Sequence, residues 1–186
     1  MATSNQPLKW ALAVTCNFLL GVFMIRDATI DDSKAIAEIY NHYVMNTSIT
    51  FEENTVPSAE MSKRIRNVQI SDLPWIVALK GNAVVGYAYA TKWKERSAYR
   101  FSVETTVYLS SKTKGEGIGT LLYEELLCRL KSLDINNVIG GITLPNPASV
   151  GLHEKMKMKK VAHFPNVGFK FGKWLDVGYW QLSLRT

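Results

Sequence analysis

The sequence predicts one α/β domain in which a single mixed sheet carries helices on both faces. The chain has 186 residues, close to the length of one domain. Its composition, 47% apolar and 20% charged, is that of a folded protein. Hydrophobic patterns follow one another in the order strand, two helices, three strands, helix, strand, helix and two strands.

The first third of the chain supplies a strand and two helices. Residues 25–28 form a short strand pattern, and Asp31 and Asp32 then cap a helix. That helix has apolar side chains at helical spacing: Ile36, Ile39, Tyr40, Tyr43 and Val44. Residues 47–53 are extended, and a second, basic helix is expected over residues 58–70.

The middle third predicts three strands and a long helix. Apolar runs at residues 75–79 and 83–90 flank a Lys-Gly-Asn turn, in which positive φ is easy. Residues 101–109 alternate as a strand does. A basic, glycine-bearing loop at residues 112–119 opens a helix with a leucine-rich face.

The last third predicts a strand, a short helix and two further strands. The strand spans residues 138–144 and ends in a Pro-Asn-Pro turn, and the short helix spans residues 149–157. Two β-type runs lie within residues 169–184, on either side of Gly172. The domain as a whole is expected to span residues 24–186.

The segment before this domain needs a separate interpretation. Residues 10–25 are mostly apolar, but the run is shorter than the roughly 20 residues that cross a bilayer. No small-residue cleavage site of a signal peptide follows it. Because the strand and helix pattern starts at Met24, we expect residues 1–23 to be an extension outside the catalytic core.

Charge and cysteine content narrow the function classes. The formal net charge of +6 favours an anionic partner, but it does not choose among nucleic acid, a membrane and a phosphorylated cofactor. Basic residues form no stripe with aromatic side chains, so we expect no nucleic-acid partner. We also expect no membrane partner. Cys16 and Cys128 cannot build a disulfide framework, and the three histidines lack ligand spacing, so no metal site is expected. We expect a cytoplasmic protein.

A glycine-rich loop is the first motif that points to a ligand. It reads Lys114-Gly115-Glu116-Gly117-Ile118-Gly119 and lies between a predicted strand and helix. Glycines let the backbone approach a ligand, and a helix N-terminus offers N–H groups to an anion such as a pyrophosphate. A tight strand–helix turn would explain the glycines equally well. The loop is not a P-loop, and it comes too late in the chain for a Rossmann site.

The loop resembles the acetyl-CoA loop of the GNAT superfamily of N-acetyltransferases, Gln/Arg-x-x-Gly-x-Gly/Ala, with Lys114 at its first position. Longer strings are similar to the phosphinothricin N-acetyltransferases: residues 41–43, 93–99, 103–108, 144–154 and 168–178, together with Phe51. The resemblance covers residues 25–184. It departs at Lys157-Met158, where the family usually has Gly-Phe.

This resemblance implies a mostly antiparallel GNAT sheet, acetyl-CoA as co-substrate, and N-acetylation of a small amino acid. Acceptors of that kind are phosphinothricin, methionine sulfoximine and methionine sulfone. It also implies a homodimer with acceptor sites near the interface. The residues it assigns to acetyl-CoA are Val107, Tyr108, Leu109, Lys114, Gly115, Glu116, Gly117, Ile118, Gly119, Thr120 and Asn146.

Two side chains are candidates for the chemistry, because acyl transfer to an amine needs a base that accepts a proton from nitrogen. Glu104 has apolar neighbours along its strand, which would raise its pKa and suit a base. The alternative is a solvent-facing strand residue. His153, in the short helix, is either catalytic or a partly buried structural histidine. The resemblance implies that Glu104 is the general base and that His153 is catalytic or orients the base.

The loop after residues 83–90 combines cations with an aromatic side chain: Lys94, Arg96 and Tyr99. Arginine binds carboxylate or phosphinate oxygens in bidentate fashion, and the alternative is a solvated charged loop. The resemblance places these residues, with Phe51, against the acceptor. Three functional alternatives remain: an acetyltransferase for another small amine or a protein N-terminus, a CoA-binding module without catalysis, and a nucleic-acid binder.

Deleting residues 2–23 is expected to leave activity and the melting temperature nearly unchanged, because every motif lies after Met24. Thermal unfolding and acetyltransferase assays of the truncated chain measure both. A large loss of folded protein would show instead that the apolar segment packs into the core.

Overall fold

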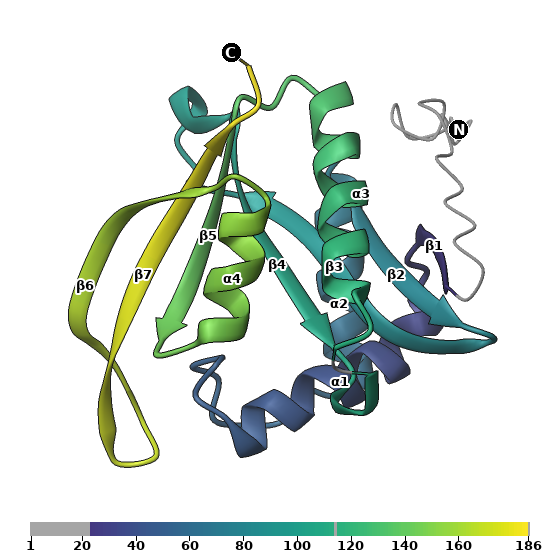
Figure 1. The fold of residues 1–186 in the computed structure, drawn as a ribbon. Helices are drawn as coiled ribbons and strands as arrows, with labels where there is room; N and C mark the ends of the chain where they lie inside the picture. Colours follow the sequence, from purple (N-terminus) through teal and green to yellow (C-terminus); the bar gives the residue numbers. More distant parts are fainter. Residues whose placement is uncertain (1–22, 114, 186) are drawn as a thin grey trace.

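A single mixed sheet organises the part of the chain that the structure describes, residues 23–113 and 115–185 of a computed structural model (Figure 1). Its seven strands lie in the order β1-β2-β3-β4-β5-β7-β6. The strands are β1 Phe23–Asp27, β2 Trp75–Lys80, β3 Ala83–Lys92, β4 Ser102–Leu109, β5 Asn137–Leu144, β6 Lys159–Lys170 and β7 Lys173–Ser183. The α-helices are α1 Ser33–Asn46, α2 Ser58–Ile70, α3 Ile118–Ser132 and α4 Pro147–Lys155.

The sheet is antiparallel except between β4 and β5, as the sequence predicted for a mostly antiparallel mixed sheet. Those two strands are parallel and pair only from Ser102 to Glu104 on β4 and from Asn137 to Ile139 on β5. Figure 1 shows them parting beyond this point, with α3 and α4 in front of the sheet and α2 behind it. The predicted fold class is confirmed.

Apolar stripes on the helices explain how they pack. On α3, Leu122, Leu126 and Leu130 recur at helical spacing and are fully buried against the sheet. Ile36 on α1 and Ile65 on α2 are buried in the same way on their helices. Burying such a side chain stabilises the fold by about 1.5–3 kcal/mol, so these stripes hold the helices in place.

The N-terminal extension expected at residues 1–23 falls outside the described residues, apart from Phe23. Phe23 is the first residue of β1, where it pairs with Lys80 on β2. Among the described residues, no helix is both long and apolar enough to cross a membrane.

Most predicted strands differ from the structure by one or two residues at an end, and the bounds of α4 and β6 differ for identifiable physical reasons. The short helix α4 begins at Pro147 and ends at Lys155, because the Asn146 side chain accepts a hydrogen bond from the Ser149 N–H and proline suits the first helical turn. The strand β6 begins at Lys159, well before residue 169. It is an edge strand with mostly exposed, partly charged side chains, so no alternating apolar pattern marks its start.

The turn after α4 shows what the departure at Lys157-Met158 does. Lys157 adopts the left-handed conformation with φ 65°, which usually requires glycine. Its N–H donates to Glu154 O, and the Met158 N–H donates to His153 O, which is the Schellman pattern of a helix end. Met158 is buried and accepts a hydrogen bond from Tyr123. The turn therefore forms with lysine, at a cost in backbone strain.

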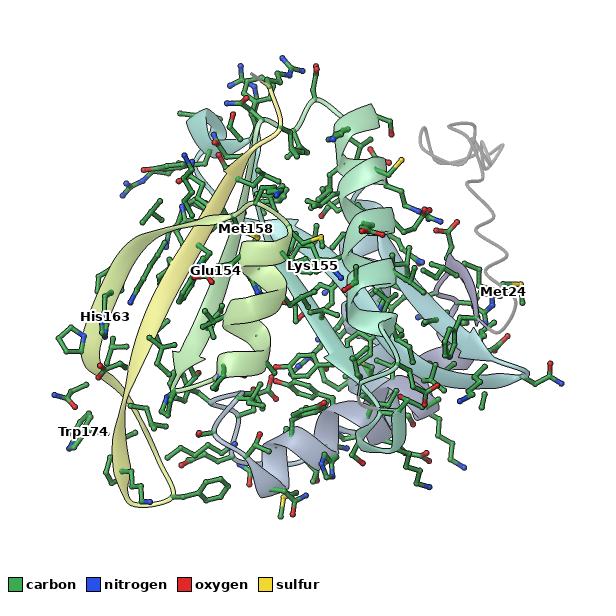
Figure 2. All side chains as sticks on the ribbon, viewed as in Figure 1. Met24, Glu154, Lys155, Met158, His163 and Trp174 are labelled. Atoms are coloured by element: carbon green, nitrogen blue, oxygen red, sulfur yellow. The ribbon has the colours of Figure 1, made fainter. Side chains whose placement is uncertain are left out.

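Lys157→Gly is expected to raise the free energy of unfolding by about 1 kcal/mol, because it removes the Cβ that disfavours the left-handed conformation. Glu154→Gly is the matched control on α4, whose labelled residues Figure 2 shows. There glycine enters a helical conformation and should lower stability by about 0.5–1 kcal/mol. Denaturant unfolding of both variants measures the difference, and equal destabilisation would contradict strain at Lys157.

Candidate active site

A groove opens where β4 and β5 part. Nine residues line it: Tyr43, Ile49, Val107, Tyr108, Leu109, Asn146, Ala148, Ser149 and Leu152. The end of β4 forms one wall, and the start of α4 forms another. The structure thus brings together the predicted cofactor residues of β4 and Asn146, which are distant in sequence.

The glycine loop adjoins this groove. Gly117 is the N-cap of α3 and adopts the left-handed conformation with φ 79°. This backbone conformation by itself favours glycine at the position. A Cβ on Gly119 would lie 3.4 Å from side-chain atoms of Leu109 and Leu152, two of the groove residues. The first N–H groups of α3 have no partner within the helix. Together with the helix dipole they suit an anion at this end of the groove.

Polar neighbours of the loop were only partly predicted. Lys114 lies outside the described residues. Glu116 forms an exposed ion pair with Lys80, at 2.7 Å between Nζ and Oε2. Thr120, in the first turn of α3, accepts a hydrogen bond of 3.2 Å from Lys155 Nζ, and Figure 2 shows Lys155 reaching from α4 toward α3. Nothing in the sequence pattern marks Lys155, because only the packing of α4 beside α3 brings it there.

Glu104 is the last residue of β4 that pairs with β5, where its partner is Ile139. A Cβ on Gly141 would lie 3.1 Å from Glu104 Oε1 and 3.1 Å from Tyr179 Cε1, so the carboxyl group lies above a glycine and beside a tyrosine. Burial raises the pKa of Glu104, and the positive charge of Lys94 partly opposes that shift. A carboxylate with a raised pKa is a stronger base than an ordinary glutamate.

His153 is buried on α4, and its environment differs from that of Glu104. Its Nδ1 donates to Ser149 O at 2.8 Å, which leaves Nε2 as the unprotonated nitrogen. A Cβ on Gly140 would lie 2.3 Å from Nε2, so the ring occupies the space above that glycine. Burial lowers the pKa of His153 and keeps the ring neutral near pH 7.

The two predicted catalytic side chains approach opposite faces of β5. Glu104 lies over Gly141 and His153 lies over Gly140. Consecutive residues of a strand present their side-chain positions to opposite faces. The two groups therefore do not form an acid–base pair in this geometry.

The predicted acceptor residues fall into two places. Lys94 and Arg96 line one cavity at the start of β4, together with Arg100. Tyr99 lies in the adjacent 3₁₀ turn and is exposed. Phe51 lies elsewhere: a Cβ on Gly168 of β6 would be 2.1 Å from its Cζ, so its ring packs on that glycine.

Lys94 also lines a second cavity, which includes Tyr179, the tyrosine beside Glu104. The other residues there include Trp93, Phe164 and Tyr179. Trp93 and Phe164 each contact the Tyr179 ring edge-on, at centroid distances of 5.4 and 5.8 Å. Sequence reasoning missed Tyr179, because only the insertion of β7 beside β5 brings it next to Glu104. No group of three or more His, Cys, Asp or Glu residues that could hold a metal ion occurs in residues 23–113 or 115–185.

Comparison with known proteins now defines the class. Residues 25–178 match the acetyltransferase (GNAT) domain family. A phosphinothricin N-acetyltransferase of Streptomyces viridochromogenes is 37% identical over 84% of this chain and 85% of that protein. An L-methionine sulfoximine/L-methionine sulfone acetyltransferase of Salmonella typhimurium is 33% identical over 86% of this chain and 94% of that protein.

A solved structure agrees with these sequence relatives. The GNAT superfamily phosphinothricin acetyltransferase of Sinorhizobium meliloti, in complex with acetyl-CoA, has a TM-score of 0.84 and 37% identity. The match covers 87% of this chain and 88% of that one. The chain belongs to the GNAT acetyltransferase family. Within that family it is a homologue of the phosphinothricin N-acetyltransferases, as the sequence motifs predicted.

Gly140→Ala is expected to destabilise the fold by about 1–3 kcal/mol, because its Cβ would overlap the buried His153 ring. Gly151→Ala on α4 is the control: a Cβ there meets nothing within 4 Å, and alanine favours a helix. Denaturant unfolding compares the two. If both variants were as stable as the parent chain, His153 would not be held over Gly140.

Proposed function

We propose that this chain transfers the acetyl group of acetyl-CoA to the α-amino group of a small amino acid of the phosphinothricin or methionine sulfoximine type. The observation that carries the proposal is Glu104, a partly buried carboxyl with a raised pKa where β4 and β5 part. The named substrates of the two relatives above support the acceptor class.

The residues around the groove fit acetyl-CoA. Val107, Leu109 and Leu152 give the groove apolar walls, which suit an aliphatic arm. Pairing of β4 with β5 stops at Glu104, so the edge of β4 beyond that residue is open to the amide groups of such an arm. The left-handed Gly117 and the N-terminus of α3 would hold the pyrophosphate. Acetyl-CoA supplies an acetyl group activated as a thioester.

The chain's own groups perform the proton transfer in this proposal. Glu104, acting directly or through water, removes a proton from the acceptor amine in a direct transfer with both substrates bound. Lys94 and Arg96 bind the acidic groups of the acceptor, and guanidinium suits the two oxygens of a carboxylate. His153 has a structural role on α4 in this proposal and is not catalytic, because its Nδ1–H donates a hydrogen bond to Ser149 O.

The same proposal includes a homodimer formed through the β6–β7 hairpin. Six large apolar side chains are exposed there: Val161, Phe164, Val167, Phe169, Phe171 and Trp174. Figure 2 shows Trp174 projecting outward from the hairpin. Clusters of this kind mark protein–protein contacts more often than free surface. Light scattering of the purified chain distinguishes a dimer from a monomer.

Thiol release from acetyl-CoA, measured over a panel of amines, tests the acceptor class. Phosphinothricin, methionine sulfoximine and methionine sulfone are expected to be turned over, and a polyamine is not, because the acceptor loop is itself cationic. Turnover of an alanyl peptide alone would favour a protein N-terminus as acceptor. Binding of acetyl-CoA without turnover of any amine would favour a non-catalytic module.

Glu104→Gln is expected to lower kcat by about 10²–10⁴-fold with little change in acetyl-CoA affinity, because it removes the base and keeps the shape. The wild-type rate should fall on the acidic side as Glu104 is protonated, at a pH above the usual glutamate range. The deficit of the variant should shrink as pH rises, since the amine then loses its proton without help. Steady-state pH profiles measure both effects.

Glu124→Gln, an exposed position on α3, is the control and should change neither rate nor profile. A Glu104→Gln variant with the wild-type kcat and the wild-type pH profile would exclude Glu104 as the base.

A further inference from the structure

A buried lysine lies at the end of β6, a strand whose other side chains are largely exposed. Lys170 is only 2% exposed. Its Nζ donates to Val44 O at 2.7 Å and to Thr50 O at 2.8 Å. Val44 belongs to the last turn of α1, where a cation is favoured by the helix dipole. Lys170 thus joins the β6–β7 hairpin to the end of α1 and to the segment that follows it.

The segment held by Lys170 is part of the site. Thr50 has Ile49 on one side, which lines the groove between β4 and β5. On its other side is Phe51, whose ring packs on Gly168 of β6. Gly168 and Lys170 are two residues apart on one strand, so they present the same face to this segment.

A second set of bonds holds the same segment from α1 and α2. Tyr40 Oη lies 2.7 Å from Thr50 Oγ1 and donates to Glu52 Oε1 at 3.0 Å. Arg64 on α2 pairs with Glu52, at 2.7 Å between Nη1 and Oε1. The helices therefore fix residues 50–52 from one side, and Lys170 fixes them from the hairpin side.

An irregularity in β6 lies just before Gly168 and Lys170. The register between β6 and β7 shifts between Phe164 and Gly168. Asn166, within the shift, has φ 52°, and its N–H donates to Asp176 Oδ1 at 2.9 Å. From Phe164 to Gly168, β6 advances four residues while β7 advances two, so β6 bulges just before the two residues that contact the segment.

We propose that Lys170 is a positioning residue for the acceptor site: it clamps residues 49–51 between α1 and the β6–β7 hairpin, and so fixes the Phe51 ring against Gly168 and Ile49 at the groove. This inference rests on the proposed function for the identity of the acceptor. The clamp itself is a property of the fold, and it is measured without activity.

Lys170→Met is the test variant, because it keeps the length of the side chain and removes the ammonium group. Lys173→Met, across the hairpin turn from Lys170 and exposed, is the matched control. In Lys170→Met, the KM for phosphinothricin or methionine sulfoximine should rise about tenfold or more, because Phe51 is the acceptor residue of the segment. The KM for acetyl-CoA should rise clearly less, because Ile49 is one of nine residues that line its groove. Lys173→Met should change neither.

Amide hydrogen exchange of residues 47–53 gives a second readout that needs no substrate. Exchange in this segment should accelerate in Lys170→Met and stay unchanged in Lys173→Met, because only the first variant releases Thr50 O. Gly168→Ala covers the case in which Lys170→Met does not fold. Its Cβ displaces the Phe51 ring while Lys170 remains, and it should raise the acceptor KM alone.

The outcomes separate the two proposals. If the wild-type chain turned over none of these acceptors but exchange still accelerated in Lys170→Met, the clamp would stand and the acceptor assignment would fail. Unchanged exchange and an unchanged acceptor KM in folded Lys170→Met would overturn the clamp. Equal rises of both KM values would also overturn it, since Lys170 would then support the fold as a whole.

Discussion

β4 and β5 pair at only three positions, and the site is built around the place where this pairing stops. Each strand is held by its other neighbour. β3 pairs with β4 from Gly86 to Lys92, and β7 pairs with all eight residues of β5. Beyond Glu104, β4 stays paired with β3 and β5 stays paired with β7, so each strand remains hydrogen-bonded on its outer side while the two part from each other. The parting opens the edge of β4, forms the groove wall at Asn146 and leaves the Glu104 carboxyl above Gly141.

Three buried or partly buried ionisable side chains, His153, Lys170 and Glu104, compensate for the loss of water around their charged groups in different ways. His153 gives up its charge, since burial lowers its pKa. Lys170 directs its Nζ to two carbonyl oxygens. Glu104 has a raised pKa, so its unfolded form ionises more readily than its folded form. Its contribution to stability is therefore greatest in acid and is lost as pH rises. The proposed base acts as the ionised carboxylate, which is the form of Glu104 that stabilises the folded state less.

Hydrophobic periodicity was sufficient to predict the order of the elements and a mixed sheet with helices on both faces, whereas its mostly antiparallel pairing was predicted from the family resemblance. The apolar spacing of α1 and α3 appears in the sequence because those helices bury one continuous face. The start of β6 could not be predicted, because the side chains of this edge strand are mostly exposed and do not alternate between apolar and polar. The bounds of α4 differed by two residues at each end, because caps and strained turns decide helix ends.

Of the candidate site, the glycine loop and Asn146 were predicted as cofactor residues. In the structure Asn146 lines the groove, and Gly119 of the loop adjoins two groove residues, Leu109 and Leu152. The sequence could not predict that Glu104 and His153 lie on opposite faces of β5. That placement depends on which of the adjacent glycines, Gly140 or Gly141, each side chain covers. Tyr179 and Lys170 were missed for a related reason. Both reach the site only because the hairpin that carries them packs beside β5 and α1.

The place of β7 between β5 and β6 also affects how the chain folds as it is synthesised. When β5 has left the ribosome, its three pairs with β4 are the only strand contacts available to it. Its long partner, β7, is translated after α4 and the whole of β6. Helices α1 to α3 and strands β1 to β4 are then complete, while β5, which leads into Asn146 at the groove, still lacks its long partner. Folding of the nascent chain is therefore expected in two stages, with β5 fully paired only in the second.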